Sequence, residues 1–142
     1  MSDETLKELA RRAVACEGWR WMEGMVAVTW PIERPLKSRV VAKNIDGYPL
    51  WLLNSRYHQG YDFVSKDALP DLNDPATLGC LLELVRKAWG DPNLYIMVAP
   101  RLNDSQPIQW AVCRGDGSPI MAGSRFDTEV HALVAALEVA DE

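Results

Sequence analysis

The run from Leu69 to Gly90 constrains the fold most, because it has the longest regular apolar spacing in the chain. Asp74 is a good N-cap residue, and Pro75 suits the first helical position. Gly90 is typical of the residue that follows a helix. Between these residues, apolar side chains recur at helical spacing on one face: Leu78, Leu81, Leu82, Val85, Ala88 and Trp89. The pattern predicts a helix over 74–90, with Leu81 and Leu82 buried.

Further helices and strands are predicted on both sides of this run. Apolar spacing indicates helices over 5–16 and 127–140. Asp46-Gly47 and Asp116-Gly117 each lie between two apolar runs, which is typical of tight hairpin turns. Pro49 lacks an N–H, so the part of the strand around Pro49 is expected to lie at a sheet edge. The predicted strands are 25–30, 39–44, 48–53, 94–99, 108–114 and 118–122.

These elements suggest an internal repeat. The Asp-Gly-x-Pro-aliphatic string occurs at 46–50 and again at 116–120. We predict an α+β fold in which two helix-plus-three-strand units with antiparallel hairpins, residues 5–53 and 77–122, share one core. A C-terminal helix completes this single domain of residues 1–142. A chance similarity is the alternative, because Asp-Gly turns are common.

The composition is that of a soluble globular protein, with 48% hydrophobic and 25% charged residues. No apolar run approaches the roughly 20 residues that span a bilayer, so no membrane partner is expected. The N-terminal residues are acidic and polar, unlike a signal peptide. Cys16, Cys80 and Cys113 lie far apart and are odd in number, which argues against a disulfide framework. A cytoplasmic location is therefore expected.

The net charge of −5 is unevenly distributed. Residues 1–66 hold 10 Lys/Arg and 8 Asp/Glu, a balance of +2, whereas residues 67–142 hold 5 and 12, a balance of −7. The acidic half makes nucleic-acid binding unlikely on electrostatic grounds. The predicted order over 5–89, helix-strand-strand-strand-helix, nevertheless matches the double-stranded-RNA-binding domain, so such a module is one alternative. The second helix of a double-stranded-RNA-binding domain would begin with basic residues. The corresponding predicted helix of this chain, over 74–90, begins with Asp74-Pro75-Ala76-Thr77.

The run LPDLNDPATLGCLLELVRKAWGD resembles a segment of small uncharacterised proteins that are encoded by tailed phages and prophages. The matching residues are Leu69–Leu72 and Asp74–Leu82, the LPDLxDPATLGCLL string. The stretches Leu9–Met25 and Phe126–Ala140 also resemble parts of those phage and prophage proteins. That family has no assigned activity. The resemblance therefore implies a phage-related origin, with a bacterial host cell as the setting, and it implies no functional residues.

The segment 54–74 is long for a loop in a compact domain, and such loops are usually functional or partly disordered. Arg56, Tyr57, His58 and Tyr61 at its centre are predicted to contact a ligand or partner. The alternative is that the aromatic residues hold the loop on the core. His58 and Asp62 suit a base and its orienting group, but no nucleophile lies near them in sequence. An enzymatic role is therefore not favoured.

A second candidate surface consists of Trp19, Arg20 and Trp21, because alternation in an extended segment would place both rings on one face. That face belongs either to the core or to a partner surface. No metal-ligand spacing is present, so no metal or cofactor is expected. We predict a non-enzymatic module that binds a host or phage protein, with interference with host defence as one such role. The alternative is a small-molecule binder or enzyme that uses the 54–74 loop.

Overall fold

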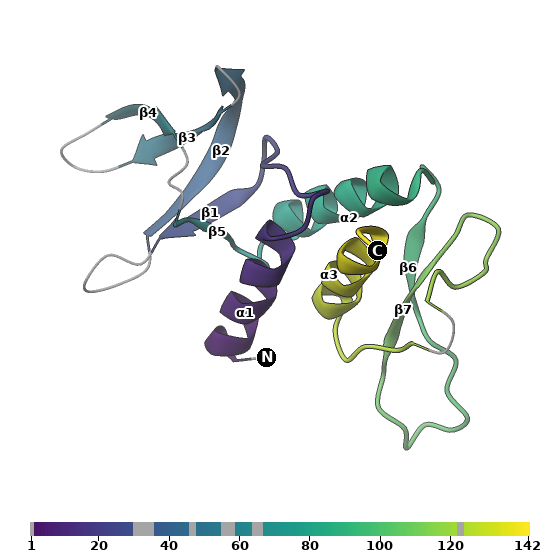
Figure 1. Ribbon diagram of the computed structural model, residues 1–142. Coiled ribbons are helices and arrows are strands. Elements are labelled where there is room, and N and C mark those ends of the chain that lie inside the picture. The colour runs from purple at the N-terminus through teal and green to yellow at the C-terminus, as the bar shows by residue number, and fades with distance from the viewer. Residues whose placement is uncertain (1, 30–35, 46–47, 55–58, 64–66, 122–123) are drawn as a thin grey trace. The chain divides into compact units, whose positions relative to one another are not determined.

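The helix predicted around Asp74 is present, and it begins and ends where the sequence indicates. In the computed structural model, which describes residues 2–29, 36–45, 48–54, 59–63, 67–121 and 124–142, this helix is α2, Pro75–Trp89 (Figure 1). The Asp74 carboxylate accepts the Thr77 N–H at 2.9 Å, as an N-cap should. Gly90 has φ of +65°, and the Asp91 N–H bonds the Arg86 carbonyl at 3.0 Å. These contacts form a Schellman motif, which satisfies the last carbonyl groups of the helix.

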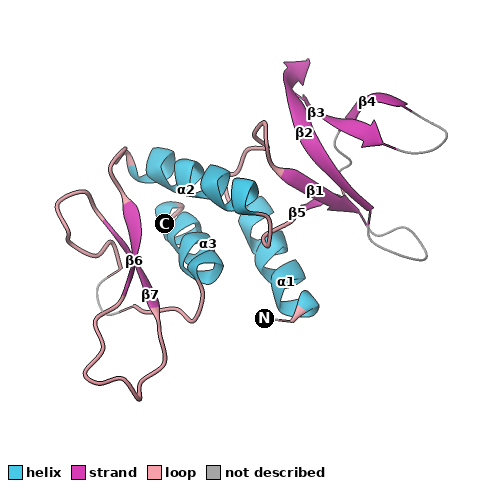
Figure 2. Ribbon diagram, turned by 180° about the vertical axis from the view of Figure 1, so that it is seen from behind, coloured by secondary structure: helices cyan, strands magenta, loops and turns pink. Residues whose placement is uncertain are grey.

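The other described elements follow in chain order. They are α1 (Asp3–Val14), β1 (Val26–Thr29), β2 (Leu36–Ile45), β3 (Tyr48–Asn54), β4 (Gln59–Phe63), β5 (Leu69–Pro70), β6 (Tyr95–Val98), β7 (Trp110–Cys113) and α3 (Glu129–Ala140). The predicted α+β class is confirmed, since helices lie beside small antiparallel sheets (Figure 2). The chain divides into two compact units, residues 1–14 with 20–80 and residues 15–19 with 81–142.

The first unit contains a sheet of order β4-β3-β2-β1-β5, with antiparallel neighbours throughout. Ile45 pairs with Tyr48, as expected for a two-residue turn, although Asp46-Gly47 itself lies outside the described residues. Helix α1 begins at Asp3 rather than at the predicted residue 5. The Ser2 hydroxyl oxygen accepts the Thr5 N–H at 3.2 Å and so caps the helix earlier than the apolar pattern suggests.

The prediction of one long loop in the first unit is wrong. The segment 54–74 is not one loop, because β4 pairs with β3 from Asn54↔Gln59 to Leu50↔Phe63 and β5 pairs with β1. Gly60 and Asp62 within β4 are weak strand formers, so pairing with β3 overrides the local preference. Strand β3 lies between β2 and β4 from Leu50 to Asn54. Pro49 lies just beyond the described β3–β4 pairs, so the expected edge position around Pro49 remains a prediction.

The buried face of α2 differs from the predicted one. Leu81 is fully buried as expected, but Leu82 is only half-buried, and Leu84 is buried instead. The buried positions are Thr77, Leu81, Leu84 and Val85. A sequence pattern assigns Thr77 to the polar face. Its hydroxyl is hydrogen-bonded inside the first unit, which allows a polar residue to join the buried face.

The second unit is built from the last half of α2, the β6–β7 pair and α3. Thr128 caps α3, because its hydroxyl oxygen accepts the His131 N–H at 3.1 Å. The predicted buried residues Val130, Leu133, Val134 and Leu137 are confirmed, and three alanines of the same helix are buried as well. The Trp89 indole N–H donates to the Ala136 carbonyl at 2.9 Å. This bond ties α2 to α3 within the unit.

The hairpin around Asp116-Gly117 has one regular strand rather than two. The Gly117 N–H bonds the Arg114 carbonyl, and the Arg114 N–H bonds the Ser118 carbonyl, so three residues form the loop. Gly117 has φ of +93°, as the last residue of such a loop requires. Beyond it, a single bridge joins Pro119 to Cys113, so the predicted strand 118–122 is reduced to one pair within the described residues.

The internal repeat is not confirmed. The described residues between α1 and α2 contain five strands, not three, so the helix-strand-strand-strand-helix order behind the RNA-binding alternative is also wrong. The described residues that follow α2 contain a two-stranded sheet. A single core shared by both halves remains a prediction.

Candidate functional site

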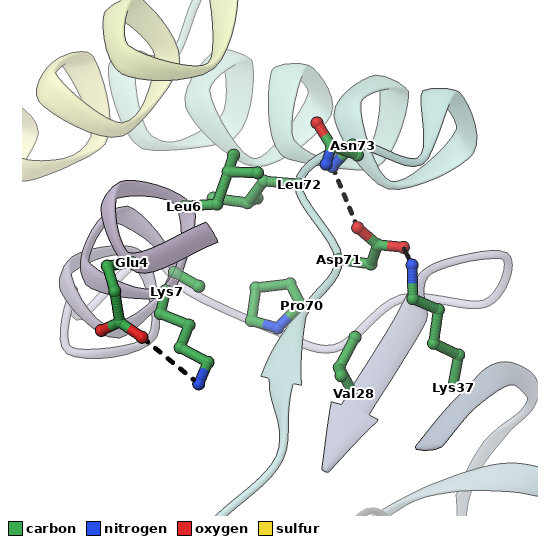
Figure 3. Close-up of a pocket in the computed structure, with 10 residues that line it drawn as sticks. Glu4, Leu6, Lys7, Val28, Lys37, Pro70, Asp71, Leu72 and Asn73 are labelled. Atoms are coloured by element: carbon green, nitrogen blue, oxygen red, sulfur yellow. Dashed lines mark hydrogen bonds and ion pairs between the residues drawn. The ribbon is translucent and has the colours of Figure 1, made fainter. Parts of the chain in front are cut away.

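A pocket of about 330 Å³ opens in the first unit beside α1 (Figure 3). Its apolar wall comes from three parts of the chain that the fold brings together: α1, β1, and β5 with the residues that follow it. The apolar residues are Leu6, Ala10, Val28, Pro70 and Leu72. Ala10, Val28 and Leu72 are almost fully buried, so the floor of the pocket is continuous with the core of the unit.

The rim of the pocket carries two ion pairs. The Lys37 ammonium lies 2.9 Å from the Asp71 carboxylate, and the Lys7 ammonium lies 3.7 Å from that of Glu4 (Figure 3). The Asp71 side chain is only 13% exposed, whereas that of Lys37 is 56% exposed. Two positive and two negative side chains therefore surround the apolar floor, and their charges sum to zero. Because the Lys37 side chain is the exposed partner of its pair, its ammonium group can turn toward a ligand.

Local backbone bonds fix the Pro70–Asn73 side of the pocket. The Asp71 N–H bonds the Val26 carbonyl at 2.8 Å, which continues the β1–β5 pairing by one residue. The other oxygen of the Asp71 carboxylate accepts the Asn73 N–H at 3.1 Å. The Asp71 carbonyl then accepts the N–H of Asp74, the N-cap of α2. The pocket wall is thus held by the same turn that starts α2.

The lining of the pocket offers groups that can bind a ligand. Its lining holds lysines, carboxylates, an amide and apolar groups, without a nucleophile and base in contact. The described residues contain no group of three or more His, Cys, Asp or Glu placed to hold a metal ion. The volume lies at the lower end of ligand pockets, which run from about 300 to 1,000 Å³. One large side chain or a small molecule would fill it.

A second, more open depression of about 420 Å³ lies in the second unit, between the end of α2 and the Arg114–Ser118 turn. Its polar groups already serve the fold. Hydrogen bonds from the Gly115 and Asn93 N–H groups hold the pKa of the Asp91 carboxyl below its usual value. The Arg114 guanidinium lies 5.4 Å from the centre of the Trp89 ring. This depression is therefore the weaker candidate.

Of the predicted loop residues, Arg56, Tyr57 and His58 lie outside the described residues. Tyr61 belongs to β4, where it pairs with Leu52, and only its backbone is described. The predicted contacts of these four residues with a partner remain predictions. The end of the same 54–74 segment, Pro70–Asn73, does line the pocket. The structure thus connects this segment with a site, through residues other than the predicted ones.

The tryptophan surface is not observed. Trp19 is only 6% exposed and belongs to the second unit, so the core alternative is confirmed for this residue. Trp21 is half-buried and packs against Ala27 and Ala68 in the first unit. Arg20 is exposed. The two rings therefore serve the interiors of different units, and the 19–21 segment has no strand geometry that would align them.

Sequence reasoning missed the residues of the pocket rim. Lys7 reads as part of a solvated helix face, and Lys37 lies in a stretch whose two prolines indicate a loop. The one available signal is Asp71-Leu72-Asn73 directly before the N-cap, because Asx residues before a helix form hydrogen-bonded turns. That signal predicts a turn but not a pocket.

No protein-family model matches this chain, and neither does any curated protein or solved structure. None of the helices in the described residues is long and apolar enough to cross a membrane.

Proposed function

We propose that this chain is a non-enzymatic binding module of phage or prophage origin that acts on a protein partner in the cytoplasm of a bacterial host. The partner is a protein of the host or of the phage, and interference with host defence is one role of this kind. The observation that carries the proposal is the pocket beside α1, with its apolar floor and paired charges.

The pocket fits a partner segment that inserts an apolar side chain. Leu6 and Val28 offer the apolar contact, and the rim lysines and carboxylates offer partners for charges of either sign beside the inserted group. The Lys37 side chain is exposed, so its ammonium group can pair with a partner carboxylate, while the Asp71 carboxylate keeps its hydrogen bond from the Asn73 N–H. Such an arrangement gives specificity through charge placement and affinity through the apolar floor.

The test compares two lysine variants that remove the same charge. Lys37→Ala removes a rim cation, whereas Lys87→Ala removes an exposed cation of α2 outside the pocket. A partner is captured from host lysate with the unaltered chain, identified by mass spectrometry, purified and titrated by calorimetry. We expect Lys37→Ala to weaken binding about tenfold or more, the effect of losing one well-placed charge contact, and Lys87→Ala to leave it within about twofold.

Equal affinity of both variants would remove the pocket from the proposal. If no protein is enriched specifically and deletion of the gene leaves phage fitness unchanged, the proposed function itself is wrong. The predicted loop contacts are tested in the same assay with Tyr57→Ala and Tyr61→Ala together. A loss of binding there, with Lys37→Ala unaffected, would assign the site to the centre of the 54–74 segment.

A small molecule is the second candidate occupant, favoured by the enclosed apolar floor and by the Pro70–Asn73 wall. A fragment mixture added to ¹⁵N-labelled protein should then shift the amide signals of Val28, Asp71 and Leu72 in a saturable way. Shifts spread over the whole chain, or none at millimolar concentrations, would exclude this candidate.

A further inference from the structure

The second unit leaves one edge of its sheet open. In the part of the chain that the structure describes, β6 pairs with β7 alone, whereas β7 also bridges to Phe126 and Pro119 on its other side. A strand edge of this kind presents backbone N–H and C=O groups that can pair with another strand.

The pairing pattern identifies which groups point outward. Trp110 exchanges both backbone bonds with Phe126, at 2.7 and 2.9 Å, so its groups point away from β6. Gln109 faces β6 instead, since its carbonyl accepts the Ala99 N–H at 2.7 Å. Because antiparallel residues alternate between the two sides, Tyr95 and Met97 bond β7. The N–H and C=O groups of Ile96 and Val98 therefore face outward.

The open edge is bounded at both ends. The Leu94 N–H bonds the Asp91 carbonyl, and the Leu94 carbonyl accepts the Arg86 guanidinium at 2.7 Å. At the other end Pro100 has no N–H, and its carbonyl accepts the Arg125 guanidinium at 2.8 Å. Four backbone groups, two donors and two acceptors on Ile96 and Val98, are thus available, and they are placed symmetrically about Met97.

The side chains of this edge do not protect it. The strand Tyr95-Ile96-Met97-Val98 contains no charge and no proline, the devices that usually blunt an exposed edge. Val98 is 41% exposed, and Leu102, shortly after the strand, is 91% exposed. The open backbone groups therefore lie beside exposed apolar surface.

We propose that β6 is a self-association edge, at which two copies of the chain pair antiparallel about a two-fold axis through Met97. In this register Ile96 of each copy lies opposite Val98 of the other, and the two pairs exchange four hydrogen bonds. Met97 lies opposite its own counterpart in a non-hydrogen-bonded pair. A second copy is the occupant because its open groups match in number, spacing and order. Shifting the register by two residues would require Leu94 or Pro100, whose groups are used or missing.

The expected dimer is weak. Four backbone bonds and a few apolar side chains bury less surface than the roughly 1,200 Å² of a stable interface. We therefore expect a dissociation constant of about 10–500 µM, typical of small transient contacts. The edge lies in the second unit and the pocket in the first, so the dimer and the proposed partner binding can fail independently.

Cysteine cross-linking tests the register. In a non-hydrogen-bonded antiparallel pair the Cα atoms lie about 4.5 Å apart, which a disulfide can bridge. Met97→Cys should therefore oxidise to a covalent dimer, whereas Ile96→Cys, which faces Val98 of the other copy, should not. The unaltered chain serves as the control for its own Cys80. Cross-linking of Ile96→Cys as efficient as that of Met97→Cys would overturn the register.

Sedimentation equilibrium tests the association itself, with two lysine substitutions that add the same charge. Val98→Lys places an ammonium group on the edge, whereas Ile108→Lys, at a side chain 52% exposed, lies outside β6. We expect the unaltered chain and Ile108→Lys to dimerise alike and Val98→Lys to stay monomeric with an unchanged thermal midpoint. A monomer at millimolar concentration of the unaltered chain, or equal loss in both variants, would overturn the proposal.

Discussion

Thr77 joins the start of α2 to β1 through one buried hydroxyl, and its replacement by valine tests how much that link contributes. The side chain is fully buried. Its hydroxyl oxygen accepts the Val26 N–H at 2.9 Å, and its O–H donates to the Asp74 carboxylate at 3.0 Å. Thr77→Val keeps the branched shape and removes both hydrogen bonds. The substitution therefore isolates the hydroxyl from the packing.

The expected loss can be worked from the two bonds. A hydrogen bond to a charged group contributes about 1.5–3 kcal/mol, and a buried donor left without an acceptor costs about 1–3 kcal/mol. The Val26 N–H becomes such a donor, because Val26 is itself buried. The extra buried methyl group of valine returns about 0.8 kcal/mol. We therefore expect Thr77→Val to lower the free energy of unfolding by about 2–5 kcal/mol.

Urea denaturation followed by tryptophan fluorescence measures this loss, and hydrogen exchange of the Val26 amide locates it in the first unit. Thr77→Ser is the matched control, because it keeps the hydroxyl and loses one methyl group, at a cost of about 1 kcal/mol. The Val26 amide should exchange faster in Thr77→Val and should remain protected in Thr77→Ser. A valine variant within about 0.5 kcal/mol of the unaltered protein would refute the reasoning, since surface changes alone reach that size.

Three further outcomes are expected. Leu81→Ala should cost about 2–5 kcal/mol in urea denaturation and half-buried Leu82→Ala clearly less; equal costs would contradict the burial. Gly117→Val should lower the thermal midpoint, because a β-branched residue resists the φ of +93°, and a neutral result would contradict the turn geometry. Burial alone would raise the pKa of Asp74, but bonds from Thr77 and Arg39 lower it below the ordinary 3.8. Its stabilising effect should be present above about pH 4 and lost as the pH falls further, so the stability gap to Asp74→Ala should narrow in acid.

The pocket and the open edge show the limit of a sequence reading for function. The 54–74 segment was predicted to carry a site from its length, and its last residues, Pro70–Asn73, do line the pocket. The rim lysines could not be found in this way, because a lysine on a helix face looks the same in sequence whether or not a pocket lies beneath it. Likewise, the edge of β6 is open because the chain after β7 returns to the far side of β7, where Phe126 and Pro119 bridge to it, and not to β6. Only the tertiary structure shows this.

The sequence by itself determined those helix ends whose capping residues lie within one turn of the helix. Asp74, Pro75 and Gly90 set the ends of α2, and Thr128 sets the start of α3, because caps act through backbone groups within one turn. Only the tertiary structure decided the pairings of residues distant in sequence. Gln59–Phe63 is a strand because β3 supplies its hydrogen-bond partners. The Thr77 side chain can be buried because its hydroxyl oxygen accepts a hydrogen bond from the Val26 N–H. Such preferences come from partners far along the chain, and no local pattern contains them.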